Sequence, residues 1–303
     1  MRTTTYKRTG PGIATIVGAA GMAILLCQGV TAEALPVDLG SAGPGNWAVL
    51  ETGNHAGNAN VSIANASNAG YINGNVGMNS RGGISDSGTP ITGNVYLGSS
   101  AGANGNLAAN VSGSVYKNAG SQTRVSQAAA DAASVASAAS ALSGSSIGDI
   151  TTGGTFSHAP GVYFLNSINL SGVTLTLDGT ANEYYVFNIA DALTLSHASI
   201  LLSGGLTAQN VLFNITRTGG TGLGMSGGLA TESVLYGIVL ADSSQIQESP
   251  GLVVGEMICG DNMSISSGAQ VQGIKVPDGG ETAALLGAAL LGIAGLRRKL
   301  RQG

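Results

Sequence analysis

The best match to a catalytic motif is Gly224-Met225-Ser226-Gly227-Gly228, which fits the G-x-S-x-G pattern of a serine nucleophile. In enzymes that pattern presents the serine hydroxyl for acyl transfer at a strained turn between a strand and a helix. Here it lies in a glycine-rich run from 219 to 228, where such matches arise by chance. No helical pattern follows Gly220, Gly222 and Gly224, which also argues against a dinucleotide-binding loop. We therefore expect no catalytic residue.

The histidine and cysteine residues of the chain do not indicate a metal or cofactor site. The three histidines, His55, His158 and His197, are far apart in sequence and lack the spacing of metal ligands. Without the terminal segments described below, the chain keeps Cys259 as its single cysteine, so neither an internal disulfide nor a thiolate metal cage can form. We expect no metal, no cofactor and no enzymatic activity.

The charge balance argues against nucleic acid as a partner. Between Leu35 and Lys275 the chain carries five basic and 13 acidic residues, which gives a net charge of −8. A protein that binds phosphates needs clustered Lys and Arg to displace counterions, and here the few cations are scattered along the sequence. The whole chain has 49 Gly, 9% charged and 4% aromatic residues, while aliphatic residues stay plentiful. Its stability must therefore come from packing and backbone pairing.

An internal repeat indicates the kind of fold that could hold such residues. Gly74-Asn75-Val76 recurs as Gly93-Asn94-Val95, and Gly113-Ser114-Val115 follows after a similar interval of about 20 residues. A short strand with Gly, Asn or Ser at its corners, repeated at this period, is typical of one coil of a β-solenoid. In the second half, aliphatic residues alternate with hydroxyl residues at 173–177 and 193–196, as period-2 strands require.

One segment has helical periodicity instead. From Gln122 to Leu142 the chain is rich in alanine and free of Gly and Pro, and Gly144 is placed to end a helix. The apolar residues at helical spacing are Val125, Ala128, Ala129, Ala132, Val135, Ala136, Ala139 and Leu142. A stripe made mostly of alanine allows close packing on a flat surface. The sequence thus predicts a mainly β fold: a right-handed β-solenoid over 35–275 with one long α-helix (about 122–142) packed alongside, and apolar helices at both termini.

The N-terminus has the features of an export signal. Arg2, Lys7 and Arg8 precede an apolar stretch from 13 to 27, and small residues at 30–34 suit cleavage by signal peptidase. We therefore predict a signal peptide over 1–34. A lipoprotein signal at Cys27 is disfavoured, because Leu26 stands where a small residue is needed.

The C-terminus combines a polar hinge, an apolar run and a basic cluster. The hinge is Val276, Pro277, Asp278, Gly279 and Gly280, the run spans 282–296, and Arg297, Arg298, Lys299 and Arg301 follow. The run is shorter than the roughly 20 residues that span a bilayer with ease, and the basic cluster would hold its end on the cytoplasmic side. An ordinary tail anchor or a C-terminal core helix are the alternatives.

This order resembles the PEP-CTERM type of bacterial sorting tail, most closely its VPDSG variant, with Gly279 where that variant has Ser. The resemblance implies that 276–303 is a sorting signal with a transmembrane helix at 282–296. It further implies export, transient membrane anchoring, and processing near the motif by an exosortase-type enzyme.

The region between the signals resembles the ice-binding-protein-like (antifreeze) family of bacteria and microalgae. Besides the alanine-rich segment, the matching stretches are 39–42 with 46–50, 160–163, 175–179, 185–189, 210–215 and 237–241. Their order fits that family. The Asn- and Gly-rich region from 53 to 119 and the lack of a long regular repeat depart from it. The resemblance implies the solenoid with its helix and, as a function, ice binding.

Ice binding needs a flat, rigid, weakly hydrophobic surface with regularly spaced hydroxyl and methyl groups, so that ordered water can bridge to the lattice. Thr174 and Thr176, then Thr194 and Ser196, are expected to point outward on adjacent coils of one face. Ser264 and Ser266 repeat the pattern further along. The alternative is that all six are ordinary solvent-facing strand residues.

Two functions are therefore left open. The first is a non-enzymatic exported surface protein that binds or adheres to ice through a flat Thr/Ser face. The second is a structural or adhesive component of the cell surface or exopolysaccharide matrix that does not touch ice. Both place the protein in the membrane transiently, and then at the cell surface or outside the cell.

Overall fold

Short strands with alternating inward and outward residues dominate the fold, as the sequence predicts. The computed structural model describes residues 35–64, 69–227 and 233–275, and these fall in one compact unit. The predicted signal peptide (1–34), the sorting tail (276–303) and the apolar helices of both termini lie outside the described residues. In the described part, no helix is both long and apolar enough to cross a membrane.

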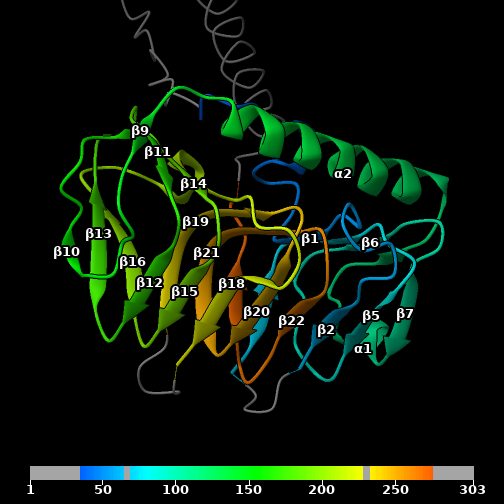
Figure 1. The fold of residues 1–303 in the computed structure, drawn as a ribbon. Helices are drawn as coiled ribbons and strands as arrows, with labels where there is room; N and C mark the ends of the chain where they lie inside the picture. Colours follow the sequence, from blue (N-terminus) through cyan, green and yellow to red (C-terminus); the bar gives the residue numbers. More distant parts are fainter. Residues whose placement is uncertain (1–34, 65–68, 228–232, 276–303) are drawn as a thin grey trace, which may run out of the picture. The chain divides into compact units, whose positions relative to one another are not determined.

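The smaller of two parallel sheets has eight strands (Figure 1). Its strands, in spatial order, are β12 (Ile168–Ser171), β15 (Leu193–Ser196), β18 (Thr221–Ser226), β20 (Gln245–Ser249), β22 (Met263–Ile265), β2 (Val61–Ile63), β5 (Gly83–Asp86) and β7 (Gly102–Gly105). We call its outer surface the eight-strand face. The short helix α1 (Leu107–Asn110) follows β7 at one end of this sheet.

The larger sheet forms two further faces, because two of its 15 strands bend. β19 (Ser233–Ala241) pairs with β16 through its first half and with β17 through its second. β21 (Gly251–Cys259) pairs in the same way with β23 and then with β1. The bends fall at Gly237 and Gly255, which are register partners with φ of 148° and 156°.

The helix-side face consists of the second halves of β19 and β21 together with eight other strands. These are β9 (Ser145–Ser146), β11 (Gly161–Leu165), β14 (Tyr185–Ile189), β17 (Val211–Ile215), β1 (Val49–Glu51), β4 (Val76–Met78), β6 (Val95–Leu97) and β8 (Val115–Tyr116). The β13 face contains the first halves of β19 and β21 together with β10 (Gly154–Thr155), β13 (Thr174–Asp178), β16 (Ser199–Ser203), β23 (Gln270–Gln272) and β3 (Tyr71–Asn73). A full coil gives one strand to each face, and isolated bridges at Ile91, Val111 and Ile150 take the place of a strand in the outer coils, so the described chain is a β-helix-like solenoid.

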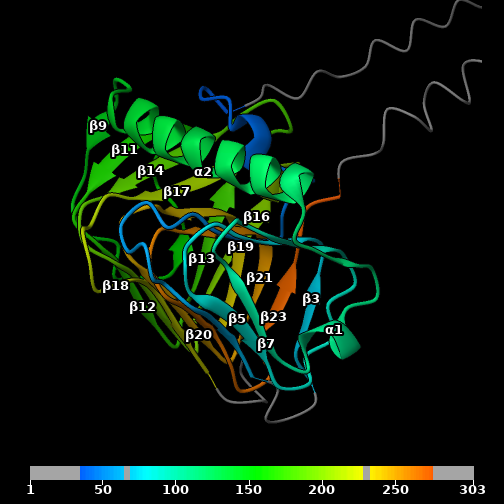
Figure 2. The same ribbon diagram turned by 90° about the vertical axis from the view of Figure 1, so that its right-hand side faces the viewer.

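The chain enters this stack in its middle. β1 lies between β21 and β4, and the coils that follow it run outward to β8 at one end. Helix α2 (Ala119–Ser140) then passes along the helix-side face, and the next strand, β9, lies at the other end (Figures 1 and 2). Its 22 residues span roughly 33 Å, a length comparable to the stack of strands beneath it.

The predicted helix is confirmed, with its limits shifted by two or three residues. It begins earlier because the Asn118 side chain accepts a hydrogen bond from the Ser121 N–H at 2.9 Å, so that Gly120 is tolerated in the first turn. It ends at Ser140, before the predicted stop at Gly144. Below its last turns, Asn188 donates to the Ala139 carbonyl at 2.9 Å and Asn214 to the Ala136 carbonyl at 3.1 Å. The residues buried under the helix are Ser121, Val125, Ala128, Ala129, Ala132, Val135 and Ala139.

The interior of the solenoid is a stack of buried, in-register side chains. Tyr163, Phe187 and Phe213 occupy the same position on successive strands, and the rings of Phe187 and Phe213 stack 5.4 Å apart. Aliphatic residues continue the layer through Val239, Met257 and the strands beyond. The prediction of a mainly β fold with one long helix is confirmed, and the right-handed sense of the coil stays a prediction.

Candidate functional site

The six candidate residues lie on two different faces. Thr194 and Ser196 belong to β15 and Ser264 to β22, all on the eight-strand face, and Ser266 directly follows β22. Thr174 and Thr176 belong to β13 in the larger sheet. Four of the six are therefore brought onto one surface.

The predicted alignment of Thr174 and Thr176 with Thr194 and Ser196 is wrong. The register partner of Thr194 in the preceding coil is Asn169, and that of Thr174 in the following coil is Ser199. A coil here holds three strands and is longer than the interval from Thr174 to Thr194. A step of that interval therefore leads from one face of the solenoid to another.

The eight-strand face carries a continuous outward row of small or polar residues. In register order these are Asn169, Thr194, Gly224, Gln247, Ser264, Ser62, Ser85 and Asn104. Successive strands in a sheet lie roughly 4.8 Å apart, so the row is a regular array. A second outward row of hydroxyls runs parallel to it through Ser171, Ser196, Ser226 and Ser249.

A buried layer lies directly behind these two rows. Its register partners are Ile168, Leu193, Leu223, Ile246, Met263, Val61 and Ile84, all buried. Close-packed aliphatic side chains hold the strands in place, so the outer rows have a rigid base. Sequence reasoning missed Asn169, Ser171, Ser62 and Ser85, although alternation with these aliphatic residues was a signal for them.

Ser226 has a role in the strand rather than in a nucleophile elbow. It is the last residue of β18 and stands in the second hydroxyl row, where its carbonyl accepts a hydrogen bond from the Ser233 hydroxyl at 2.6 Å. Ser226 therefore ends one strand, and the described chain resumes at Ser233 in another strand, β19, rather than in the helix that the G-x-S-x-G chemistry requires.

The β13 face has a different character, because apolar side chains occupy its centre. Its first outward row is Thr174, Ser199, Val234, Leu252, Gln270 and Tyr71. Beside that row, Leu201, Leu202, Leu206, Tyr236 and Val254 line an open hollow of about 450 Å³. Large side chains next to a hollow make this surface less even than the eight-strand face.

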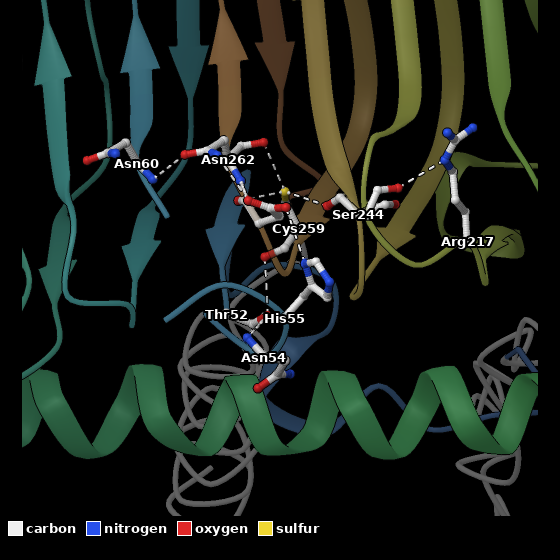
Figure 3. Close-up of polar contacts among 10 residues, drawn as sticks. Thr52, Asn54, His55, Asn60, Arg217, Ser244, Cys259 and Asn262 are labelled. Atoms are coloured by element: carbon white, nitrogen blue, oxygen red, sulfur yellow. Dashed lines mark hydrogen bonds and ion pairs between the residues drawn. The ribbon is translucent and has the colours of Figure 1, made fainter. Parts of the chain in front are cut away.

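A polar corner lies where β1, β19 and β21 end (Figure 3). Asn54 donates through Nδ2 to the Asp242 carboxylate at 2.7 Å and to the Ala129 carbonyl of α2 at 2.9 Å, which ties the corner to the helix. His55 contacts Asp261 at 3.2 Å. No group of three or more His, Cys, Asp or Glu in the described segments could hold a metal ion. The corner thus joins coil to helix.

Cys259 lies in the same corner, where backbone oxygens surround its thiol (Figure 3). Its Sγ lies 3.0 Å from the Asp261 carbonyl oxygen and 3.2 Å from that of Ser244. Burial raises the pKa of the thiol to about 12, because the thiolate would lose its hydration. The group is therefore a buried structural thiol and not a nucleophile.

Glu51 makes the stability of this corner dependent on pH. The side chain is fully buried, and its Oε2 accepts a hydrogen bond from the Ser80 N–H at 3.0 Å. Burial raises the pKa of Glu51 from 4.5 to about 7. Burial also raises the pKa of Asp242 and Glu256, so all three carboxyl groups change stability in the same direction.

We expect the contribution of Glu51 to folding stability to be greatest below pH 4.5 and to be lost as the pH rises to 7, because the folded state binds the Glu51 proton more tightly than the unfolded state does. In Glu51→Gln, the free energy of unfolding should fall by about 3 kcal/mol less than in the parent as the pH rises from 4.5 to 8. Urea unfolding of both proteins at pH 4.5, 6 and 8 measures it. Asp38→Asn, at an exposed carboxyl, is the control for the loss of one negative charge. Parallel profiles for the parent and Glu51→Gln would contradict this prediction.

Comparisons with known proteins give the family of the chain and the type of its C-terminal segment. A model of the ice-binding-like family matches residues 57–272, and the chain therefore belongs to that family. A model of the VPDSG-CTERM motif matches residues 275–300, which identifies the C-terminal segment as a sorting signal of this type. A search of the curated proteins finds no match.

Solved structures of ice-binding proteins share the fold. One from the Antarctic ascomycete Antarctomyces psychrotrophicus is 25% identical, with a TM-score of 0.53, over 79% of this chain and 99% of that one. One from an Arctic yeast is 18% identical, with a TM-score of 0.55, over 80% of this chain and 95% of that one. One from an Antarctic bacterium of the Flavobacteriaceae is 22% identical, with a TM-score of 0.54, over 84% and 52%. The family and these structural neighbours are ice-binding proteins rather than enzymes.

Proposed function

We propose that this chain is an exported, non-enzymatic surface protein that binds or adheres to ice through the eight-strand face. The observation that carries the proposal is the pair of in-register rows of small polar residues over a rigid aliphatic layer. Family membership and the ice-binding proteins of the same fold support it. The binding domain spans 35–275 in this proposal.

Thr194, Ser196, Ser264 and Ser266 are the proposed contacts among the six candidates. Each hydroxyl contributes little by itself, so affinity must accumulate over the area that matches the lattice. Thr174 and Thr176 lie on the β13 face and would contact ice only if that surface were the binding one.

Thermal hysteresis and inhibition of ice recrystallisation, measured on the purified span from Leu35 to Lys275, test this function. We expect inhibition at concentrations where an unrelated acidic protein has none. If both assays show no activity in the folded protein, the ice-binding proposal fails.

The second candidate is a structural or adhesive component of the cell surface or exopolysaccharide matrix. The VPDSG-CTERM match supports it, because such a sorting signal is expected to deliver the domain to the cell surface. In this case the folded span from Leu35 to Lys275 would lack ice activity but would co-sediment with isolated cell-surface material.

If the C-terminal segment is a sorting signal, its deletion should change where the protein is found. In our proposal signal peptidase removes 1–34, and the apolar run at 282–296 then anchors the chain transiently in the membrane. An exosortase-type enzyme processes the chain near Val276 to Gly280. The processed domain then reaches the cell surface. Deleting 276–303 should release soluble protein, because the apolar run that anchors the chain in this proposal is lost. Fractionation and immunoblotting measure this.

The matched control keeps the anchor and removes the motif. Changing Val276, Pro277, Asp278, Gly279 and Gly280 to alanine, with 282–303 intact, should leave an unprocessed protein in the membrane fraction. Truncated protein that stayed with the membrane would contradict the anchoring role of the tail.

A further inference from the structure

An aromatic stack reaches the surface where the helix-side face ends. Tyr96 on β6 and Tyr116 on β8 are register partners, and their rings stack 5.2 Å apart at 23°. Trp47 contacts Tyr96 edge-on at 5.6 Å and is buried. The series therefore runs from a buried ring to an exposed one.

Tyr116 is the unusual member of this series. Among the described residues, Tyr116 is the one large hydrophobic side chain that is exposed, at 36% of its full surface. In that same part β8 pairs with β6 alone, so no further strand of the sheet covers Tyr116. Its ring can accept another flat group on the stack.

Positive charge gathers at the same place. The Arg124 guanidinium carbon lies 4.5 Å from the Tyr96 ring centre and 5.1 Å from that of Trp47. Lys117 follows Tyr116 directly and is exposed. The ion pairs of the described residues involve neither cation. Of the five basic residues between 35 and 275, Arg124 thus lies over the ring that stacks on Tyr116, and Lys117 is the next residue after Tyr116, in a domain of net charge −8.

We propose that Tyr116, Arg124 and Lys117 form a binding site for an acidic saccharide, such as a chain of hexuronate units. The C–H face of a pyranose ring would stack on Tyr116, and its carboxylate would meet Arg124 and Lys117. Arg124 is held by two rings, so its planar donor fork is pre-organised for a carboxylate. A continuous nucleic acid strand fits less well, because its phosphates would also face the acidic remainder of the domain.

The site lies on the helix-side face, away from the strands of the eight-strand face. It therefore does not depend on ice binding, and a protein could use both surfaces together. An ice assay and a saccharide assay can succeed or fail separately.

Trp47 is the single tryptophan of the chain and contacts both Tyr96 and Arg124, so its fluorescence reports on the site. The full-length protein would be titrated with oligogalacturonate, with neutral dextran oligomers and with a single-stranded oligonucleotide. We expect saturable binding of oligogalacturonate, with weaker binding of the other two.

Variants connect that binding to the named residues. Tyr116→Ala should weaken oligogalacturonate binding at least about fivefold, while Tyr116→Phe keeps it, because the ring face and not the hydroxyl makes the contact. The Tyr116 carbonyl, which accepts from the Ser121 hydroxyl at 3.0 Å, is present in both. Arg124→Gln should remove the preference for the acidic over the neutral oligomer, and Arg217→Gln, at a cation paired with Asp191, should not.

Three results would overturn the proposal. They are no saturable binding of oligogalacturonate, equal affinity in the parent and Tyr116→Ala, and tighter binding of the oligonucleotide than of the saccharide. Circular dichroism of each variant confirms that the comparison is between folded proteins.

Discussion

Gly255→Ala is expected to destabilise the domain by about 3 kcal/mol or more, because an added methyl group has no space at the bend of β21. A Cβ atom at this position would lie 1.8 Å from the carbonyl oxygen of Gly237 and 2.6 Å from its carbonyl carbon. Both atoms belong to the backbone of the neighbouring coil, so relief requires the two coils to separate. Urea unfolding followed by circular dichroism measures the change.

Gly148→Ala is the matched control, since a Cβ at Gly148 would meet nothing within 4 Å. Its stability should stay within about 1 kcal/mol of the parent. If Gly255→Ala is as stable as Gly148→Ala, the close approach of the two bends does not require glycine at position 255.

Thr194→Tyr is expected to raise the concentration needed to inhibit ice recrystallisation about tenfold or more. Thr194 stands in the first outward row between Asn169 and Gly224, and its neighbours Leu193 and Leu195 are buried. A tyrosine there would project above a row of small side chains and prevent flat contact, while the buried layer stays intact. Circular dichroism should therefore be unchanged.

Two controls separate the position from the substitution. Thr176→Tyr places the same side chain on the β13 face and should keep activity. Gly224→Ser adds a small hydroxyl in the same row as Thr194. A Cβ at Gly224 would have its nearest contacts at 3.7 and 4.0 Å, so there is space for it. This variant should also keep activity. If Thr176→Tyr loses activity and Thr194→Tyr keeps it, ice meets the β13 face.

Local features of the fold could be predicted from sequence, since local patterns determine them. The alanine stripe from Val125 to Ala139 predicted the helix, and the alternation at 193–196 predicted strand β15. The helix start was missed because the Asn118 cap outweighs the cost of Gly120 in the first turn. That cost is about 1 kcal/mol in a helix interior.

The assignment of strands to faces could not be predicted in the same way. Coil length varies, so the interval from Thr174 to Thr194 carries no fixed meaning, and only the pairing with Asn169 places Thr194 in its row. The polar corner was missed for a similar reason, because Thr52, Asn54 and Asp242 come together only after β1 pairs with β21.

The entry of the chain into the middle of the stack has a consequence for the order of folding. β1, β2 and β3 pair with β21, β22 and β23, so the first coil and the last one close a seam across about 200 residues of sequence. Pairings of such long range form slowly, because the chain entropy must be lost before the contacts stabilise it. A chain threaded N-terminus first therefore keeps its first coil open on one side until residues 270–272 emerge. In the export that we propose, this topology would delay closure of the fold until the last coil has crossed the membrane.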